Sequence, residues 1–267
     1  MTGWRDIYAQ QFRSTLASFV QYRASMFIWM IWQVMEPLIF LVVWSVVSKS
    51  TGNGIGGFTE NDFAAYFITL MVVNHITFTW VMYEFEYRVR HGSLSFALLR
   101  PIHPIHSDIV ANLSSKMITM PVMILIAVFL TLLFKPTFHF TLLGLIGFIP
   151  AALFAFIMRF MIEWTLALVA FWTTRMSAVH QGYYVATLFL SGQMAPLALL
   201  PRFVQTAATF LPFRWMISFP VEVFLGKLTL NEILTGLGVQ LIGIGLAYVF
   251  LKLVWRAGVR VYSAVGA

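Results

Sequence analysis

Residues 26–47 read MFIWMIWQVMEPLIFLVVWSVV, an apolar run whose only charged side chain is Glu36. About 20 predominantly apolar residues suffice for a helix to cross roughly 30 Å of hydrocarbon. Five further runs of this kind follow, at 63–83, 117–134, 142–172, 183–200 and 233–255. Because only helices and closed barrels span a membrane, the sequence predicts an all-α polytopic membrane protein with six transmembrane helices.

Composition supports this interpretation. The chain of 267 residues is 60% hydrophobic and 10% charged, whereas soluble domains carry about 25% charged residues. The net charge of +7 comes from cations scattered between apolar runs, so it does not indicate nucleic acid as a partner. The absence of cysteine excludes a disulfide framework and a cysteine nucleophile. We expect one membrane domain over 26–267, preceded by a short segment over 1–25.

That N-terminal segment has an apolar stripe. Arg and Gln residues separate aromatic and leucine residues that recur every three or four positions: Trp4, Tyr8, Phe12, Leu16 and Phe19. The pattern over 4–22 predicts an amphipathic helix that lies in the membrane plane. The alternative is an ordinary helix that packs on the bundle.

The distribution of Lys and Arg predicts the orientation. Eleven lie on the side that holds both termini, the segment 84–116 and the link 173–181, and five lie on the other side. Cytoplasmic loops are enriched in Lys and Arg, so both termini are expected in the cytoplasm. Six crossings satisfy that parity.

Between the fifth and sixth runs, the stretch 194–228 is apolar but interrupted by Pro196, Pro201, Pro212 and Pro220. Irregular backbone at membrane depth must be shielded by protein or line a wet cavity. We therefore expect outer re-entrant helices that dip into the membrane and return.

Three ionisable residues lie well inside predicted spans: Glu36, Arg159 and Glu163. Each charge costs about 2.5–3.5 kcal/mol at the bilayer centre on insertion scales, so each should face the bundle interior or a partner. Arg159 and Glu163 are four residues apart and can pair on one helix face. Two interpretations remain open: an ion pair that fixes helix packing, or a polar lining of a transport cavity.

The polar loop 84–115 contains a short helical motif. Gly92 is expected to end one helix, and Arg100-Pro101 closes the next. Leu94, Leu98 and Leu99 form a small apolar face between them. Such a helix favours a groove on another protein. The alternative is a surface helix that packs on its own bundle.

Sequence motifs for catalysis are missing. The chain has no G-x-x-x-x-G-K phosphate loop, so we expect it neither to bind nor to hydrolyse ATP. His103 and His106 with Asp108 are too few for a metal site, because the other histidines are scattered over different segments. No catalytic or metal-binding residues are predicted.

Four short motifs carry a family resemblance. They are GSLSFALLRP at 92–101, MAPLALLP at 194–201, FLPFRW at 210–215 and FPVEVFLGK at 219–227. In their order and placement along nearly the whole chain, they resemble the permeases of ATP-binding-cassette (ABC) type 2 transporters. The nearest branch is that of bacterial exporter permeases, which includes viologen-type exporters.

The resemblance implies a permease subunit of an ATP-driven exporter in the bacterial inner membrane. It implies a second permease, identical or related, and two copies of an ABC ATPase subunit that bind ATP and magnesium. The substrate would be amphipathic or hydrophobic and would leave toward the outside, with membrane lipid around the bundle.

The resemblance also assigns roles to segments. Residues 4–22 would be the interfacial helix and 194–228 the outer gate. The ATPase-coupling residues would be Gly92, Leu94, Leu98, Leu99, Arg100 and Pro101. The gate residues would be Pro196, Pro201, Pro212, Phe213 and Trp215.

Two rival functions remain. A channel or secondary transporter would better fit broken helices at mid-membrane in matching halves of the chain, but the sequence shows breaks only near the outer face. A lipid-modifying enzyme would need converging catalytic groups, for which His103 and His106 are the only candidates.

Overall fold

The computed structural model describes residues 4–21, 23–52, 54–173 and 175–262. Within these ranges the chain forms helices joined by turns and contains no β-strand, which confirms the predicted all-α class. The helices are α1 (Trp4–Gln21), α2 (Arg23–Ser50), α3 (Glu60–Thr77), α4 (Val81–Arg90), α5 (Leu94–Leu98), α6 (Pro104–Phe134), α7 (Leu142–Ala167), η1 (Leu168–Phe171), α8 (Ser177–Leu190), η2 (Leu197–Leu199), α9 (Arg202–Phe210), α10 (Pro212–Met216), α11 (Ser218–Phe224) and α12 (Leu230–Val261).

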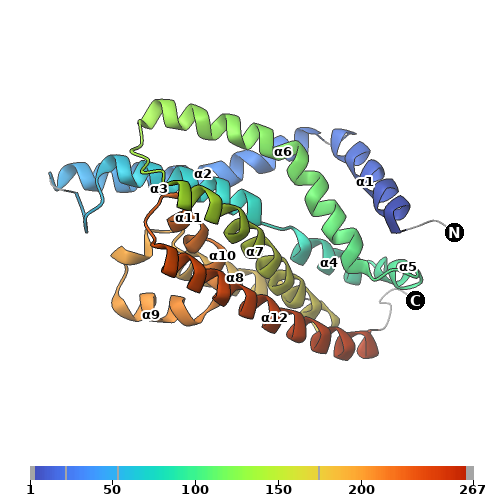
Figure 1. Ribbon diagram of the computed structural model, residues 1–267. Helices are drawn as coiled ribbons and strands as arrows, with labels where there is room; N and C mark the ends of the chain where they lie inside the picture. Colours follow the sequence, from blue (N-terminus) through green and yellow to red (C-terminus); the bar gives the residue numbers. More distant parts are fainter. Residues whose placement is uncertain (1–3, 22, 53, 174, 263–267) are drawn as a thin grey trace.

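In the described part of the chain, five helical segments are long and apolar enough to cross a membrane: α2, α3 with α4, α6, α7 with η1, and α12. They run along the length of the bundle (Figure 1). Their outward faces expose large apolar side chains, among them Trp32 (71% exposed), Leu132 (73%) and Ile149 (70%). Contiguous apolar surface of this kind indicates a lipid-facing exterior.

The predicted fifth span, 183–200, is wrong in extent. Helix α8 contains fourteen residues and ends at Leu190, so it rises only about 21 Å. The chain then turns at Gly192, whose φ of +84° favours glycine, and a Cβ there would lie 2.4 Å from the Tyr66 hydroxyl. A sixth crossing therefore stays a prediction.

The predicted second span, 63–83, lies within the membrane-capable segment Glu60–Arg90, but its helix is interrupted. Helix α3 ends at Thr77 and α4 begins at Val81. Phe78 has extended backbone (φ −61°, ψ 143°) and follows α3 directly. The intervening residues contain neither proline nor glycine, so the break depends on side chains elsewhere in the fold.

Helix α3 lies at the centre of the bundle. It begins with a capping box between Thr59 and Asp62, and its faces are buried along most of its length. Phe63, Phe67 and Leu70 are at most 1% exposed and belong to the largest apolar cluster, which also draws residues from α2, α6 and α7. A helix that is apolar on all sides is expected in such a core position.

The proline-rich segment after α8 forms the short helices α9, α10 and α11. Pro201 caps α9 and Pro212 is the first residue of α10, where its missing N–H costs nothing. These helices lie at the end of the bundle opposite α5 (Figure 1). The breaks between these short helices agree with the expectation that prolines interrupt the stretch 194–228. The depth of the helices in a membrane stays a prediction.

Helix α1 packs against α6. Gln11 donates a hydrogen bond to Ser107 Oγ (3.0 Å), and Tyr8 and Phe12 are half-buried. Trp4 and Phe19, which complete the predicted apolar stripe, have side chains outside the described set. The packing agrees with the alternative of a helix docked on the bundle, and an in-plane orientation stays a prediction.

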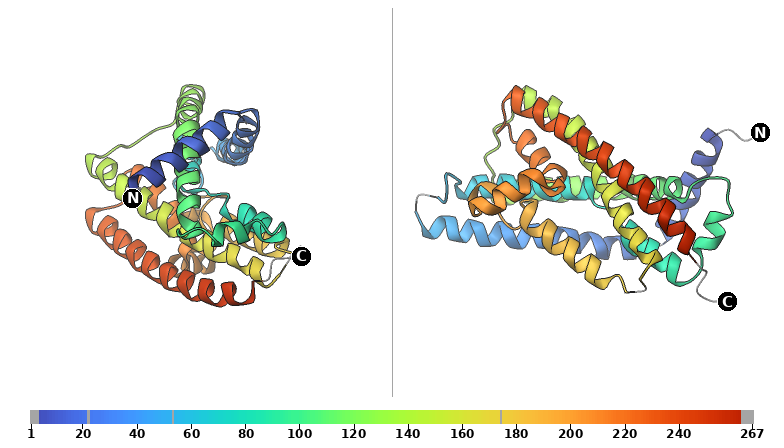
Figure 2. Two further views of the ribbon diagram at one scale, coloured as in Figure 1. Left: turned by 90° about the vertical axis from the view of Figure 1, so that its right-hand side faces the viewer. Right: turned by 90° about the horizontal axis from the view of Figure 1, so that it is seen from below.

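The first residues of α1 and the last of α12 lie at the same end of the bundle as α5 (Figures 1 and 2). This arrangement agrees with the orientation that the charge pattern predicts.

We expect single cysteines at Ser50 and His91 to react with an impermeant thiol reagent from opposite sides of the membrane, because these exposed positions lie at opposite ends of the bundle. The measurement is labelling of intact cells against labelling of inverted vesicles. The native chain without cysteine is the blank. Labelling of both positions from outside the cell would contradict the predicted orientation.

A buried charge network and a candidate coupling surface

The predicted pair of Arg159 and Glu163 forms within α7. Arg159 Nε lies 2.8 Å from Glu163 Oε1, and the two side chains are 4% and 3% exposed. The four-residue spacing places both groups on the α7 face that is turned toward α3 and α8. The charges are therefore paired inside the bundle and do not face lipid.

Arg159 also holds the end of α3. Its Nη1 donates to Asn74 Oδ1 (2.8 Å) and to Thr77 Oγ1 (2.9 Å), both in the last turn of that helix. Gln193, after α8, donates to the same Asn74 oxygen (3.2 Å). The guanidinium lies 5.5 Å from the ring centre of Phe78, the first residue after α3. One buried cation thus connects α7, α3 and the loop after α8.

Glu163 holds the other side of the break. It accepts hydrogen bonds from Thr79 Oγ1, in the non-helical link, and from the hydroxyl of Tyr183 in α8 (3.0 Å). Both carboxylate oxygens therefore have donors. A buried ion pair is tolerated when its remaining hydrogen-bonding capacity is satisfied in this way. The interpretation of the pair as a determinant of helix packing fits this geometry better than a pathway lining.

Lys116 in α6 caps the broken helix. Its Nζ donates to the backbone carbonyls of His75 (2.9 Å) and Phe78 (2.8 Å). Such carbonyls lose their helical partners where α3 stops, and a cation near a helix C-terminus is favourable. The His75 ring in turn contacts Gln33 Oε1 of α2 (2.6 Å) and Thr119 Oγ1 of α6 (2.9 Å).

The sequence placed Lys116 at the end of the polar segment 84–116, and the structure places it inside α6 with its ammonium at the end of α3. Without Lys116, ten Lys and Arg residues lie on the predicted cytoplasmic side and five lie on the other side. The charge pattern therefore predicts the same orientation.

Glu36 does not join the other two charges. It is half-buried on α2 and accepts a hydrogen bond from the Tyr184 hydroxyl of α8 (3.2 Å). Tyr184 is 46% exposed. The three predicted ionisable residues therefore divide into a buried structural pair and one carboxylate near the surface between α2 and α8.

Helix α5 is anchored by two of the three leucines that were expected to meet a partner, Leu94 and Leu98. Gly92 separates it from α4 with a φ of +67°, as predicted. Leu94 is fully buried beside Trp164 and Leu168, and Leu98 packs on the same cluster. In this structure Leu94 is unavailable to a partner protein, because it fastens α5 to its own bundle.

The outward side of α5 presents different apolar residues. Phe96 is 72% exposed and Leu99 is 83% exposed, followed by the exposed Arg100 and Pro101. We call these four residues the coupling surface. Sequence reasoning missed Phe96, although its position two residues after the buried Leu94 places it on the opposite side of one helical turn.

Asp108 takes part in a second buried network at this end. Arg88 Nη2 lies 2.8 and 3.0 Å from its two carboxylate oxygens, and Trp164 Nε1 donates to it at 2.9 Å. These bonds join α4, α6 and α7 beneath α5. Among the described residues, no group of three or more His, Cys, Asp and Glu side chains could hold a metal ion.

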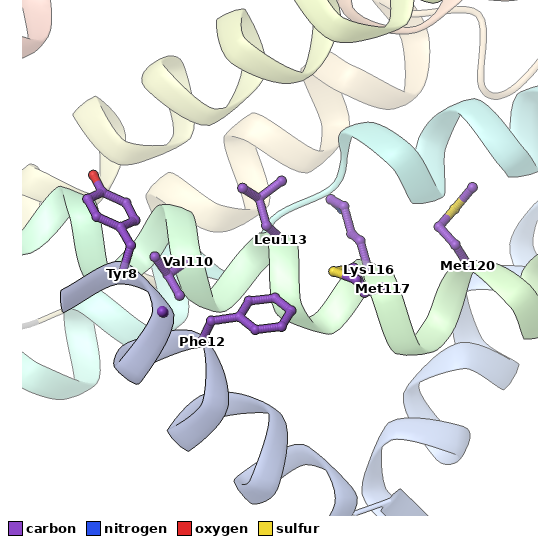
Figure 3. Close-up of a pocket in the computed structure, with 8 residues that line it drawn as sticks. Tyr8, Phe12, Val110, Leu113, Lys116, Met117 and Met120 are labelled. Carbon is purple, nitrogen blue, oxygen red and sulfur yellow. The ribbon is translucent and has the colours of Figure 1, made fainter. Parts of the chain in front are cut away.

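A cleft of about 630 Å³ lies between α1 and α6. Figure 3 shows the side chains of Tyr8 and Phe12 from α1 beside the part of α6 that carries Val110 and Leu113, with Met120 farther along α6. The lining is mostly apolar. Lys116 contributes its aliphatic stem, because its ammonium donates to a backbone carbonyl elsewhere. Such a cleft suits an alkyl chain.

The predicted gate residues gather at the opposite end. Pro196 is buried after α8, while Phe213 and Trp215 are half-buried in α10. Trp215 Nε1 donates to the Thr209 carbonyl (3.0 Å), and the Phe213 ring lies 6.0 Å from that of Tyr183. The ring contact of Phe213 with Tyr183 connects α10 to the buried charge network, because Tyr183 donates to Glu163. Pro201 and Pro212 begin helices and do not enter these contacts.

The apolar exterior and the buried charges define a multi-pass membrane protein. The chain belongs to the ABC-2 family of transporter proteins, whose family model matches residues 30–266. It is therefore a membrane permease component of an ABC transporter, which is not itself catalytic and has an ABC ATPase subunit as its partner. A search of curated proteins finds no match.

We predict that the charge pair behaves non-additively. Arg159→Met leaves a buried carboxylate without its cation and should lower the free energy of unfolding by about 3–5 kcal/mol. Glu163→Gln keeps one acceptor oxygen, and its amide NH2 can donate to the second of the two hydroxyls of Tyr183 and Thr79, so it should cost less. The double variant should be more stable than the sum of the single losses by at least about 1 kcal/mol.

The measurement is a double-mutant cycle by denaturant unfolding in detergent micelles. A matched cycle on Lys49 and Glu60, an ion pair at 3.5 Å with 74% and 44% exposed side chains, should give almost no coupling. Equal coupling energies in the two cycles would show that the buried pair has no special role.

Proposed function

We propose that this chain is an exporter permease that works with a second permease, identical or homologous, and with two copies of an ABC ATPase subunit. The single observation that carries the proposal is the coupling surface. A permease without a phosphate loop obtains ATP-driven motion only through a protein contact. Phe96 and Leu99 offer an exposed apolar anchor on a helix that the bundle holds firmly.

The contacts that fix α5 to the bundle support a role in transmitting motion from the ATPase to the permease. Leu94 and the Arg88–Asp108–Trp164 network connect α5 and α4 to α7. Ser95 Oγ also contacts the Tyr262 hydroxyl after α12 (3.1 Å). A displacement of the coupling surface by the closing ATPase would therefore be passed to α4, α7 and α12 together. ATP and magnesium would bind in the ATPase subunit.

The pathway would follow the surface between α2 and α8. Glu36 and Tyr184 place polar groups on a face that otherwise exposes apolar residues such as Trp32 and Met35. A half-exposed carboxylate at membrane depth is costly against lipid, so the second permease is expected to cover this face. The mixture of a carboxylate and apolar side chains suits an amphipathic or hydrophobic substrate, of the drug, lipid or glycolipid type.

Export is the direction that the sequence resemblance supports, within the bacterial branch that includes viologen-type exporters. The charge asymmetry, with α5 and both ends of the described chain on the basic side, supports an inner-membrane orientation with cytoplasmic termini. In this orientation α9, α10 and α11 would form the outer gate.

We expect Phe96→Asp/Leu99→Asp to insert and fold normally, because both side chains are exposed. Loss of two apolar anchors worth at least about 1.5 kcal/mol each should weaken ATPase binding about a hundred-fold or more. The measurement is recovery of the co-expressed ATPase in a pull-down, together with its hydrolysis rate.

Two control variants separate loss of ATPase binding from the effect of added charge and from loss of folding. Val261→Asp places one such charge on an exposed site (51%) at the end of α12 and should keep the ATPase bound. Leu94→Asp buries a carboxylate and should reduce folded yield before any binding is measured. Parental ATPase recovery by the Phe96/Leu99 variant would exclude α5 as the coupling element.

A further inference from the structure

A second cavity, of about 480 Å³, lies among α9, α10, α11 and the start of α3, at the end of the bundle opposite α5. Its size falls within the roughly 300–1,000 Å³ that is usual for small-molecule sites. Unlike the cleft beside α1, it is lined by charged and polar groups. These include Tyr66, Gln205, Thr209, Arg214, Glu222 and Lys227.

The acid in this cavity is already engaged. Glu222 Oε2 lies 3.1 Å from Arg214 Nη2, and Glu222 Oε1 accepts a hydrogen bond from Ser218 Oγ (2.8 Å). Each oxygen of the carboxylate therefore has a donor. The lining contains two cations, Arg214 and Lys227, and one acid, so the cavity carries a net positive charge.

Arg214 is the first cation. Its side chain lines the cavity and is 29% exposed, while its Nε is buried and has no hydrogen-bond partner in the described chain. A guanidinium presents several N–H groups in a planar fork that matches phosphate and carboxylate oxygens. The pair with Glu222 uses only part of that fork.

Lys227 is the second cation. Its Nζ lies 3.9 Å from the ring centre of Phe58, and no described carboxylate forms an ion pair with it. Partial burial lowers the pKa of Lys227, and the charges of Asp62 and Glu222 only oppose this shift. The lysine remains accessible from outside. An anion that entered the cavity would supply the missing counter-charge.

Helix α9 places this cavity beside an apolar surface. Phe203 and Phe210 are seven residues apart on one face and are 75% and 85% exposed. Gln205 and Thr209 line the cavity. A short helix with an apolar outer face and a polar inner face fits the boundary between acyl chains and headgroups. A ligand seated here would meet cations at one end and aromatic rings at the other.

We propose that this cavity binds the anionic phosphate or carboxylate headgroup of a membrane amphiphile, with Arg214 and Lys227 as the recognising cations and the alkyl part along Phe203 and Phe210. The site lies within one chain, so binding requires neither the ATPase nor a second permease. Failure of the proposed exporter function would leave this binding intact.

The test is native mass spectrometry of the delipidated protein in detergent, titrated with short-chain phosphatidylglycerol or phosphatidylcholine. We expect phosphatidylglycerol to bind about ten-fold more tightly, because only its headgroup carries a net negative charge. Lys227→Gln should reduce that preference several-fold, and Lys227→Arg should restore it. Lys49→Gln removes an exposed cation of the α2–α3 loop region and should leave the preference unchanged.

Competition with inorganic phosphate distinguishes the source of the anion. Displacement of phosphatidylglycerol only by a large excess of phosphate would support a lipid headgroup as the ligand. Equal affinity for free phosphate would overturn the role given to the alkyl part and Phe203. Equal binding of the two lipids, or a parental preference in a monodisperse Lys227→Gln variant, would overturn the site itself.

Discussion

The ion pair between Arg159 and Glu163 is the interaction on which the rest of this bundle depends. Two charges in an apolar interior are tolerated because their remaining hydrogen-bonding groups are satisfied by Asn74, Thr77, Thr79 and Tyr183. Most of these partners belong to the end of α3 or to the link that follows it. The pair therefore fixes where the central helix stops. Lys116 completes the arrangement from α6, because it supplies donors to carbonyls that the interrupted helix leaves without partners.

This interruption has consequences at both ends of the molecule. Toward one end it separates α3 from the arm formed by α4 and α5, which a second network around Asp108 and a cluster around Leu94 hold against α7. The arm thereby presents Phe96 and Leu99 outward. Toward the other end, Tyr183 connects Glu163 with the ring of Phe213 in α10. In the proposed exporter, one contiguous set of packed side chains would thus relate the ATPase contact to the outer helices.

The sequence predicted the parts of this structure that depend on local pattern. Long apolar runs identified most of the spans, four-residue spacing identified the Arg159–Glu163 pair, and Gly92 marked the end of a helix. Prediction failed where distant groups decide the outcome. Phe78, Thr79 and Trp80 carry no local signal for a break, since the break is stabilised by residues from α6 and α7. The burial of Leu94 was likewise hidden, because one turn of helix has apolar residues on both sides and only the neighbouring bundle determines which side is covered.

The most direct test of the central claim is the backbone conformation of residues 78–80 in a cryo-electron microscopy map of the chain purified with its ATPase in lipid nanodiscs. The account predicts a non-helical link there, with Arg159 and Glu163 paired beside it and Lys116 Nζ at the carbonyls of His75 and Phe78. A helix that runs without interruption from Glu60 to Arg90, with Arg159 and Glu163 apart, would contradict it.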